Sequence, residues 1–264
     1  MTKTIIVTGA SSGIGKALSL HLAKLGHTVI AIGRNKKSLE ELKAQEPKNI
    51  TPIVADITIN TEREKIIQAL PKNITGVCLV HNAGIANPVV LKEMTEEEWD
   101  QHYLVNTKAP LFLTKVLLPY LSNGGRVLHI STNLAHKAMP GFAAYGISKA
   151  AFYMTKEFCN SELLENDIAF GSAMPGIVDT PIQEHIRSVS TNRFPNVGLF
   201  QGFKSHDELL NPSTAAKFLT WVLLETDKND FVKGEWDIYS AEHHKFWAEP
   251  NEIKSREEKK LSLK

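Results

Sequence analysis

Short apolar runs alternate with longer amphipathic segments along most of the chain. The apolar runs are typical of strands buried on both faces, and they occupy residues 4–8, 27–32, 51–55, 76–80, 125–130 and 168–173. Apolar residues recur with helical spacing at 16–25, 38–45, 61–70, after residue 95 and from 211 to about 225, and another strand is expected within 231–239. Strands and helices that alternate in this way form βαβ units. The pattern therefore predicts an α/β fold, with a doubly wound parallel sheet and helices on both faces.

The first predicted strand runs directly into a glycine-rich turn that opens a helix. Glycines allow a tight turn and a close approach of the backbone to a pyrophosphate, and the helix N-terminus offers free N–H groups and positive partial charge. A turn without a ligand is the alternative, but the strand–turn–helix context favours a dinucleotide site. The expected contacts are Gly9, Ser11, Ser12, Gly13, Ile14 and Gly15.

The end of the second predicted strand bears on the choice of cofactor. In dinucleotide folds an acidic residue at this point holds the ribose hydroxyls of NAD. Here Gly33 occupies that position and Arg34 follows it. A guanidinium can pair with the 2′-phosphate of NADP, whereas a carboxylate would repel it. We therefore expect NADP(H), the alternative being that Arg34 is simply solvated.

Tyr145 and Lys149 form the most reactive pair in the sequence. Their spacing places both side chains on one face of a helix, one turn apart. A nearby ammonium favours the phenolate and so lowers the pKa of the tyrosine. Such a tyrosine can give a proton to a carbonyl oxygen or take one from an alcohol near neutral pH.

Other polar residues lie where predicted strands end or where a helix is interrupted. Ligands bind beyond the carboxyl ends of parallel strands, although turn-forming residues are also common there. Pro110 lacks an N–H, so it leaves the backbone carbonyl of Asn106 unsatisfied and should kink the helix. That carbonyl is a plausible anchor for water, or the proline serves packing alone. The residues at strand ends are Asp56, Asn82, Ala83, Gly84, Ser131 and Thr132.

Taken together, these motifs resemble the short-chain dehydrogenase/reductase family over about residues 3–240. The matching motifs are TGASSGIG at 8–15, NAG at 82–84, Asn106, Ser131-Thr132, Tyr145-x-x-x-Lys149 and Pro175-Gly176. The resemblance implies a single Rossmann domain with a seven-stranded parallel sheet. It implies Tyr145 as the acid/base, Lys149 as the residue that lowers its pKa and binds ribose, and Asn106 as the holder of a relay water. It also implies that Asp56 contacts adenine, that residues 82–84 line the cofactor, and that Pro175, Gly176, Val178 and Thr180 surround the nicotinamide.

Two positions depart from the patterns of the family. The catalytic serine expected thirteen residues before the tyrosine is replaced by Thr132, which keeps the hydroxyl but has a stiffer side chain. We prefer Thr132 to Ser131 because successive strand residues face opposite ways. Within the family, residues 176–183, 200–204 and 208–210 resemble sepiapterin reductases and, more closely, microbial benzil reductases. The acidic residue that holds pterin is replaced by Ser240, although Asp237 could substitute for it.

The last third of the catalytic domain, which spans residues 1–243, is expected to shape the substrate site. Residues 181–210 follow no regular pattern, and we interpret about 180–211 as a substrate lid. The aromatic residues of this lid suggest an apolar or aryl substrate, or they pack the lid down or form a subunit interface. Residues 244–264 are strongly charged and are expected to be a solvated or disordered tail.

Composition excludes several classes of partner. The 264 residues are 42% hydrophobic and 22% charged, as in an ordinary globular protein, and a net charge of +1 attracts neither nucleic acid nor an acidic membrane. No apolar run could span a bilayer and no signal peptide is evident, so we expect a cytoplasmic location. Cys78 and Cys159 lie in apolar surroundings outside any metal-binding pattern, so we expect reduced thiols and no metal.

The sequence therefore predicts an NADPH-dependent reductase of small-molecule ketones or diketones. Tyr145 would protonate the carbonyl oxygen, and Thr132 would hydrogen-bond it. The alternatives are a pterin reductase, an enzyme that works in the direction of alcohol oxidation, and a non-catalytic NADPH-binding regulator. Family habit suggests a homodimer or homotetramer, formed through the long helices that follow the fourth and fifth strands.

Overall fold

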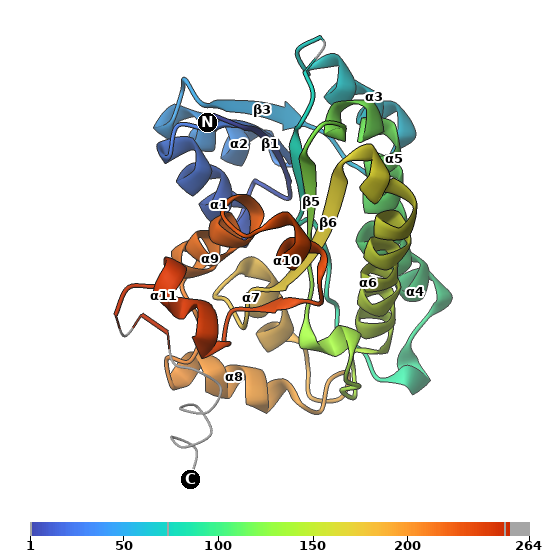
Figure 1. Ribbon diagram of the computed structural model, residues 1–264. Helices are drawn as coiled ribbons and strands as arrows, with labels where there is room; N and C mark the ends of the chain where they lie inside the picture. The colour runs from blue at the N-terminus through green and yellow to red at the C-terminus, as the bar shows by residue number, and fades with distance from the viewer. Residues whose placement is uncertain (1, 73, 251, 254–264) are drawn as a thin grey trace.

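The central sheet is parallel and has the strand order β3-β2-β1-β4-β5-β6-β7. The computed structural model (Figure 1) describes residues 2–72, 74–250 and 252–253. Because β1 lies inside the sheet and the chain winds outward to β3 before it returns to β4, the predicted doubly wound arrangement is confirmed. The strands are β1 (Thr4–Thr8), β2 (Thr28–Gly33), β3 (Ile50–Val54), β4 (Cys78–His81), β5 (Gly125–Ile130), β6 (Ile168–Met174) and β7 (Trp236–Asp237).

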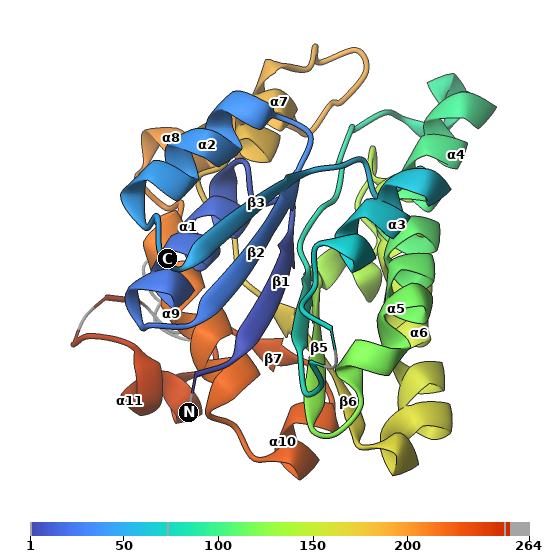
Figure 2. The same ribbon diagram turned by 90° about the horizontal axis from the view of Figure 1, so that it is seen from above.

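Helices cover both faces of the sheet (Figure 2). On one face lie α1 (Gly13–Lys24), α2 (Lys36–Gln45) and α9 (Pro212–Leu224). On the other lie α3 (Asn60–Gln68), α4 (Glu96–Tyr103), α5 (Ala109–Leu121) and α6 (Ala143–Leu163). Most of these helices bury apolar side chains against the central strands, which are apolar on both faces, whereas α4 packs on α6. No helix in the described ranges is long and apolar enough to cross a membrane.

The predicted strands lie within one or two residues of the observed ones, except at the edge of the sheet. There, only Trp236–Asp237 pairs with β6, and Phe231 belongs instead to α10 (Lys228–Val232). Asp227 starts this helix, because its carboxylate accepts a hydrogen bond from the Asn229 N–H.

Residues 181–210 are not irregular as expected, while their role as a substrate lid stays a prediction. The segment forms α7 (Pro181–Ser188) and α8 (Val197–Ser205), which pack together (Figure 1). Thr180 caps α7 and Pro181 occupies its first position, which is a common helix start.

The prediction of a solvated tail from residue 244 is also wrong for the residues that the structure describes. The helix α11 (His244–Trp247) lies against α9, and Trp247 packs on Phe218. Glu252 accepts hydrogen bonds from Thr214 and Lys217 of α9. Residues 251 and 254–264 lie outside the described ranges.

Candidate active site

A single cavity of about 830 Å³ joins the predicted cofactor site to the predicted catalytic residues. It follows the carboxyl edge of the sheet, as expected for a ligand site in this fold. One end lies at the glycine turn and Arg34, and the other at the α7–α8 segment. Of the predicted site residues, those in its wall are Gly9, Ser11, Ser12, Gly13, Ile14, Arg34, Asp56, Asn82, Ala83, Gly84, Thr132, Tyr145, Lys149, Pro175, Gly176, Val178 and Thr180. Gly15 and Asn106 lie behind the wall.

The glycine turn is braced from behind by Asn82. The Asn82 side chain donates to the carbonyl of Thr8 at 2.9 Å, while the backbone N–H groups of Asn82 and Ala83 donate to the Thr8 hydroxyl at 3.0 and 3.1 Å. A Cβ at Gly15 would lie 2.4 Å from the Asn82 amide nitrogen, so only glycine fits. Asn82 thus holds the turn in shape. The buried hydroxyl of Thr8 also helps to hold it, and the sequence did not indicate this role.

At the end of β2, Arg34 extends beside Asp56, with 3.7 Å between its Nη1 and the carboxylate. Its side chain is 75% exposed and therefore available to an anionic ligand. Burial alone would raise the pKa of Asp56, but hydrogen bonds from Thr58 and the Arg34 guanidinium outweigh burial and lower it. A Cβ at Gly33 would lie 3.0 Å from the Ser11 hydroxyl, so the turn fits closely over this glycine.

Tyr145 and Thr132 meet through their hydroxyl groups. Thr132 ends the loop from β5, and its Oγ1 also accepts a hydrogen bond from the Leu134 N–H at 3.3 Å. Burial raises the pKa of Tyr145 to about 12, and the hydrogen bond with Thr132 opposes that rise. The opposing effect comes from Thr132 and not from Lys149, so the lowering expected from Lys149 stays a prediction. Ser131 also lines the cavity, and its buried hydroxyl has no hydrogen-bond partner among the described residues.

Lys149 is buried beside this pair. Its ammonium donates to the carbonyl of Ile130 at 2.8 Å. Burial lowers its pKa to about 8, and the carboxylate of Glu235 opposes that shift. The lysine is therefore mostly protonated at neutral pH, while Tyr145 is a neutral phenol, so the pair holds protons that it can donate.

Asn106 lies in a π-helical turn, Leu104–Lys108, between α4 and α5. Pro110 cannot donate to the Asn106 carbonyl, and such turns are frequent at functional sites. The Asn106 side chain makes three hydrogen bonds. It accepts from the Ile85 N–H, and it donates to the Ile85 carbonyl and to the Ser148 hydroxyl, each at 3.0 Å. Ser148, one residue before Lys149, thus locks the helix to α6, and nothing in the sequence singled it out.

The segment after β6 closes the cavity from the other side. Val178 and Leu210 form an isolated parallel bridge, and the Tyr239 hydroxyl accepts a hydrogen bond from the Ile177 N–H at 3.2 Å. A Cβ at Gly13 would lie 3.1 Å from the Thr180 methyl group, so the glycine turn and this segment are in contact.

The substrate end of the cavity is apolar. Phe194 and Phe200 are buried and pack against Phe142, so these aromatic residues hold the α7–α8 segment in place. Phe200 and Phe203 also contribute to the cavity wall. Asp237 reaches the wall as well, whereas Ser240 is not among the lining residues. No cluster of three or more His, Cys, Asp or Glu side chains suited to a metal occurs in the described part of the chain.

The arrangement fits an extended nicotinamide dinucleotide. The cavity runs from the N-terminus of α1, where an anion is favoured, to the buried Lys149. The residues between these points offer backbone groups and small side chains that leave room for the ligand.

Comparison with known proteins agrees with this reading. The family model for short chain dehydrogenase matches residues 3–190. The chain belongs to the short-chain dehydrogenase family. Members of this family use nicotinamide cofactors on carbonyl or hydroxyl groups, which assigns this chain to the same class of oxidoreductases.

Individual short-chain dehydrogenases extend the comparison over nearly the whole chain. A benzil reductase ((S)-benzoin forming) from Bacillus cereus is 30% identical over 88% of this chain and 96% of its own. A 3-oxoacyl-[acyl-carrier-protein] reductase from Thermotoga maritima is also 30% identical, over 88% of this chain and 94% of its own. The crystal structure of a short chain dehydrogenase/reductase from Saccharomyces cerevisiae, at 27% identity, superimposes with a TM-score of 0.84 over 93% of this chain and 99% of that one.

Proposed function

We propose that this short-chain dehydrogenase is an NADPH-dependent carbonyl reductase for apolar ketones or 1,2-diketones of the benzil type. The observation that carries the proposal is the hydrogen-bonded pair of Tyr145 and Thr132, placed between buried Lys149 and an aromatic chamber. Two hydroxyl groups that converge on one point can both contact a single carbonyl oxygen.

When bound, a reduced nicotinamide supplies hydride to a carbonyl carbon. Tyr145 then gives its phenolic proton to the oxygen, and Thr132 hydrogen-bonds that oxygen while negative charge develops on it. Lys149, held on the Ile130 carbonyl, returns a proton toward the phenolate, and the Asn106 carbonyl anchors the water that resupplies it.

Four observations support NADPH and an aryl diketone. Arg34 is exposed at the point where a 2′-phosphate would lie, and an angucycline C-6 ketoreductase structure with bound NADP is 25% identical, with a TM-score of 0.75. Phe142, Phe200 and Phe203 offer ring faces to an aryl group. The benzil reductase relatives reduce a substrate of this kind by name. Asp237 in the wall keeps pterin as the second candidate, because a carboxylate can hold a pterin ring.

The test is to follow loss of nicotinamide absorbance with NADPH, and separately with NADH, against benzil and against sepiapterin. We expect rapid oxidation of NADPH with benzil and little with sepiapterin or with NADH. A Tyr145→Phe variant should lose activity by about a thousandfold or more while its affinity for NADPH stays within about twofold. Faster reduction of sepiapterin than of benzil would identify the enzyme as a pterin reductase instead. NADPH binding without reduction of either compound would point to a regulator.

We further propose that copies of the chain associate through α5 and α6. Side chains of both helices and of the preceding α4 line an apolar groove on the surface, and Met154 and Phe158 in it are 48% and 62% exposed. Exposed aromatic and methionine side chains of this kind are enriched at protein interfaces.

A further inference from the structure

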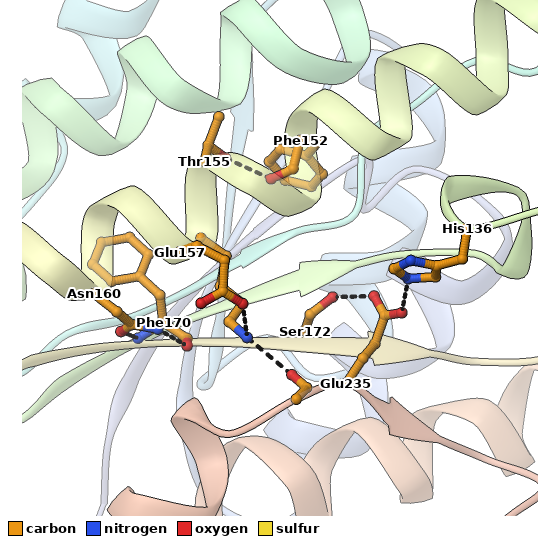
Figure 3. A network of polar contacts seen from close by, with 10 residues as sticks. His136, Phe152, Thr155, Glu157, Asn160, Phe170, Ser172 and Glu235 are labelled. Carbon is orange, nitrogen blue, oxygen red and sulfur yellow. Dashed lines mark hydrogen bonds and ion pairs between the residues drawn. The ribbon is translucent and has the colours of Figure 1, made fainter.

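Glu235 is a buried carboxylate in the short connection between α10 and β7. Only 7% of its side chain is exposed. One of its oxygens accepts a hydrogen bond from the Ser172 hydroxyl at 2.6 Å, and the other lies 2.6 Å from Nε2 of His136 (Figure 3). A buried carboxylate is costly unless it is paired or hydrogen-bonded, so this placement requires both partners.

The connection that carries Glu235 is fixed to α6 at a second point. Lys156 is fully buried and donates to the Gly234 carbonyl at 2.9 Å, and it also pairs with Glu157 at 2.8 Å (Figure 3). The His136 ring packs edge-on against Tyr153 of the same helix. Glu235 is therefore held at a defined place against β6 and α6.

His136 ends the turn that Thr132 begins. The 3-10 turn Asn133–Ala135 is capped at its start by the Thr132 hydroxyl, which accepts from the Leu134 N–H. At its end, the N–H of His136 donates to the Asn133 carbonyl at 3.0 Å. Because the Thr132 hydroxyl also contacts Tyr145, linked contacts run from Glu235 to the phenol of Tyr145.

We propose that Glu235 is a positioning residue of the active site: through His136 it fixes the turn that presents the Thr132 hydroxyl to the substrate. The proposal rests on the proposed function, in which that hydroxyl and Tyr145 act on one oxygen. A catalytic hydroxyl must be held to a fraction of an ångström. The turn packs against α6 on one side, and the link from Glu235 through His136 fixes its far end.

The same carboxylate has an electrostatic effect on Lys149. Burial lowers the pKa of Lys149, and the negative charge of Glu235 raises it again. Without that charge, the ammonium would lose its proton at a lower pH. The other titratable groups around this cluster are Tyr153, Lys156 and Glu157 of α6, His136 of the turn, and His81 and His129 of the sheet.

The test compares Glu235→Ala, His136→Ala and their double variant with a control, Glu162→Gln. The control removes an exposed carboxylate from the same helix, α6, away from this cluster. We expect each single variant to lower kcat for benzil reduction by about tenfold, with NADPH affinity, followed by its fluorescence, within about twofold. The double variant should lose little more than either single one, because both break the same link. The control should stay within about twofold of the wild type in kcat.

A charge-only variant separates the two effects. Glu235→Gln removes the charge but can still bond both partners, because its oxygen can accept from His136 while its amide nitrogen donates to the Ser172 hydroxyl. We therefore expect most of kcat to remain at pH 7. Its loss of activity at high pH should begin about half a pH unit or more below that of the wild type. Additive single variants, or wild-type kcat and pH profiles in all of them, would overturn the proposal.

Amide hydrogen exchange decides the question without any turnover. We expect residues 132–137 to exchange about tenfold faster in Glu235→Ala and His136→Ala than in the wild type or in Glu162→Gln. If the wild type reduces no carbonyl, the proposed function fails, but hydrogen exchange still tests whether Glu235 fixes the turn through His136. Unchanged exchange in both alanine variants would overturn the inference even where the enzyme is active.

Discussion

At the scale of single residues, the Thr132 hydroxyl is placed by two contacts rather than by its own rotamer alone. It accepts from the Leu134 N–H and it meets the Tyr145 phenol. Its methyl group adds bulk without removing either contact. The threonine in place of the more usual serine is therefore compatible with the proposed role.

This placement predicts different outcomes for two substitutions at one position. Thr132→Ser keeps the hydroxyl, and we expect kcat to stay within about fivefold of the wild type. Thr132→Val keeps the shape but removes the hydroxyl, and kcat should fall by about a hundredfold or more. Steady-state kinetics with benzil measures both values of kcat, and Tyr145→Phe gives the lowest kcat for comparison. Equal activity of the serine and valine variants would contradict the role of the hydroxyl.

Two buried histidines on neighbouring strands predict acid sensitivity. Burial, followed by the charge of Lys149, lowers the pKa of His81 to about 3, and burial also lowers that of His129 well below its ordinary value. The unfolded chain then binds more protons than the folded one. Stability is complete above the unfolded value of about 6.5 and is lost as pH falls toward the folded values.

The expected loss is about 1.4 kcal/mol of unfolding free energy per pH unit for each such group. Urea unfolding between pH 6.5 and pH 4 measures it. His81→Gln can still bond the Thr114 hydroxyl, which lies 2.7 Å from His81 in the wild type, but it does not titrate. We expect this variant to show a shallower pH dependence, and identical slopes in both proteins would refute the assignment.

The convergence of Tyr145, Lys149 and Thr132 on one cavity could be predicted, because their spacing carries the information. Tyr145 and Lys149 share one helix face, and Thr132 follows the end of a strand. The contacts of Thr8, Ser148 and Glu235 could not be predicted, because each depends on a partner distant in sequence. The raised pKa of Tyr145 could not be predicted either, since it depends on burial.

At the scale of elements, the C-terminal segment is an additional layer over α9. Trp247 packs on Phe218 and donates its indole N–H to His243 at 2.9 Å, and Phe246 stacks on Trp221. The strands and the long helices were predictable because their apolar periods are long. The helices α7, α8 and α11 were not, because they are short and are stabilised mainly by tertiary packing.

The packing of α11 predicts a cost for removing its tryptophan. We expect Trp247→Ala to lower the free energy of unfolding by about 2 kcal/mol, less than for a fully buried tryptophan because the side chain is only partly covered. Urea denaturation measures the effect. Lys245→Ala, an exposed position on the same helix, is the control and should change stability by less than about 0.5 kcal/mol. Equal stability of all three proteins would show that the segment adds nothing.

At the scale of the whole molecule, the doubly wound parallel sheet was predictable because strands and helices alternate along the chain. The assembly of the chains was not predictable in the same way, because one chain does not show its partner.

The groove along α5 and α6 makes a definite prediction about that assembly. Phe158→Asp should shift the protein toward monomer in light scattering, because a charge in an apolar interface is unfavourable. Leu91→Asp, at an exposed leucine outside the groove, should leave the mass unchanged. Identical masses for wild type and Phe158→Asp would place the interface elsewhere or show a monomer.

The close fit of Ser11 over Gly33 couples substitutions at two positions that are distant in the sequence. An acidic side chain at residue 33, which would favour NAD, brings its Cβ to 3.0 Å from the Ser11 hydroxyl. The Ser11 side chain would then have to shift by a few tenths of an ångström. We therefore expect Gly33→Asp to be better tolerated together with Ser11→Gly, which removes that side chain, than alone.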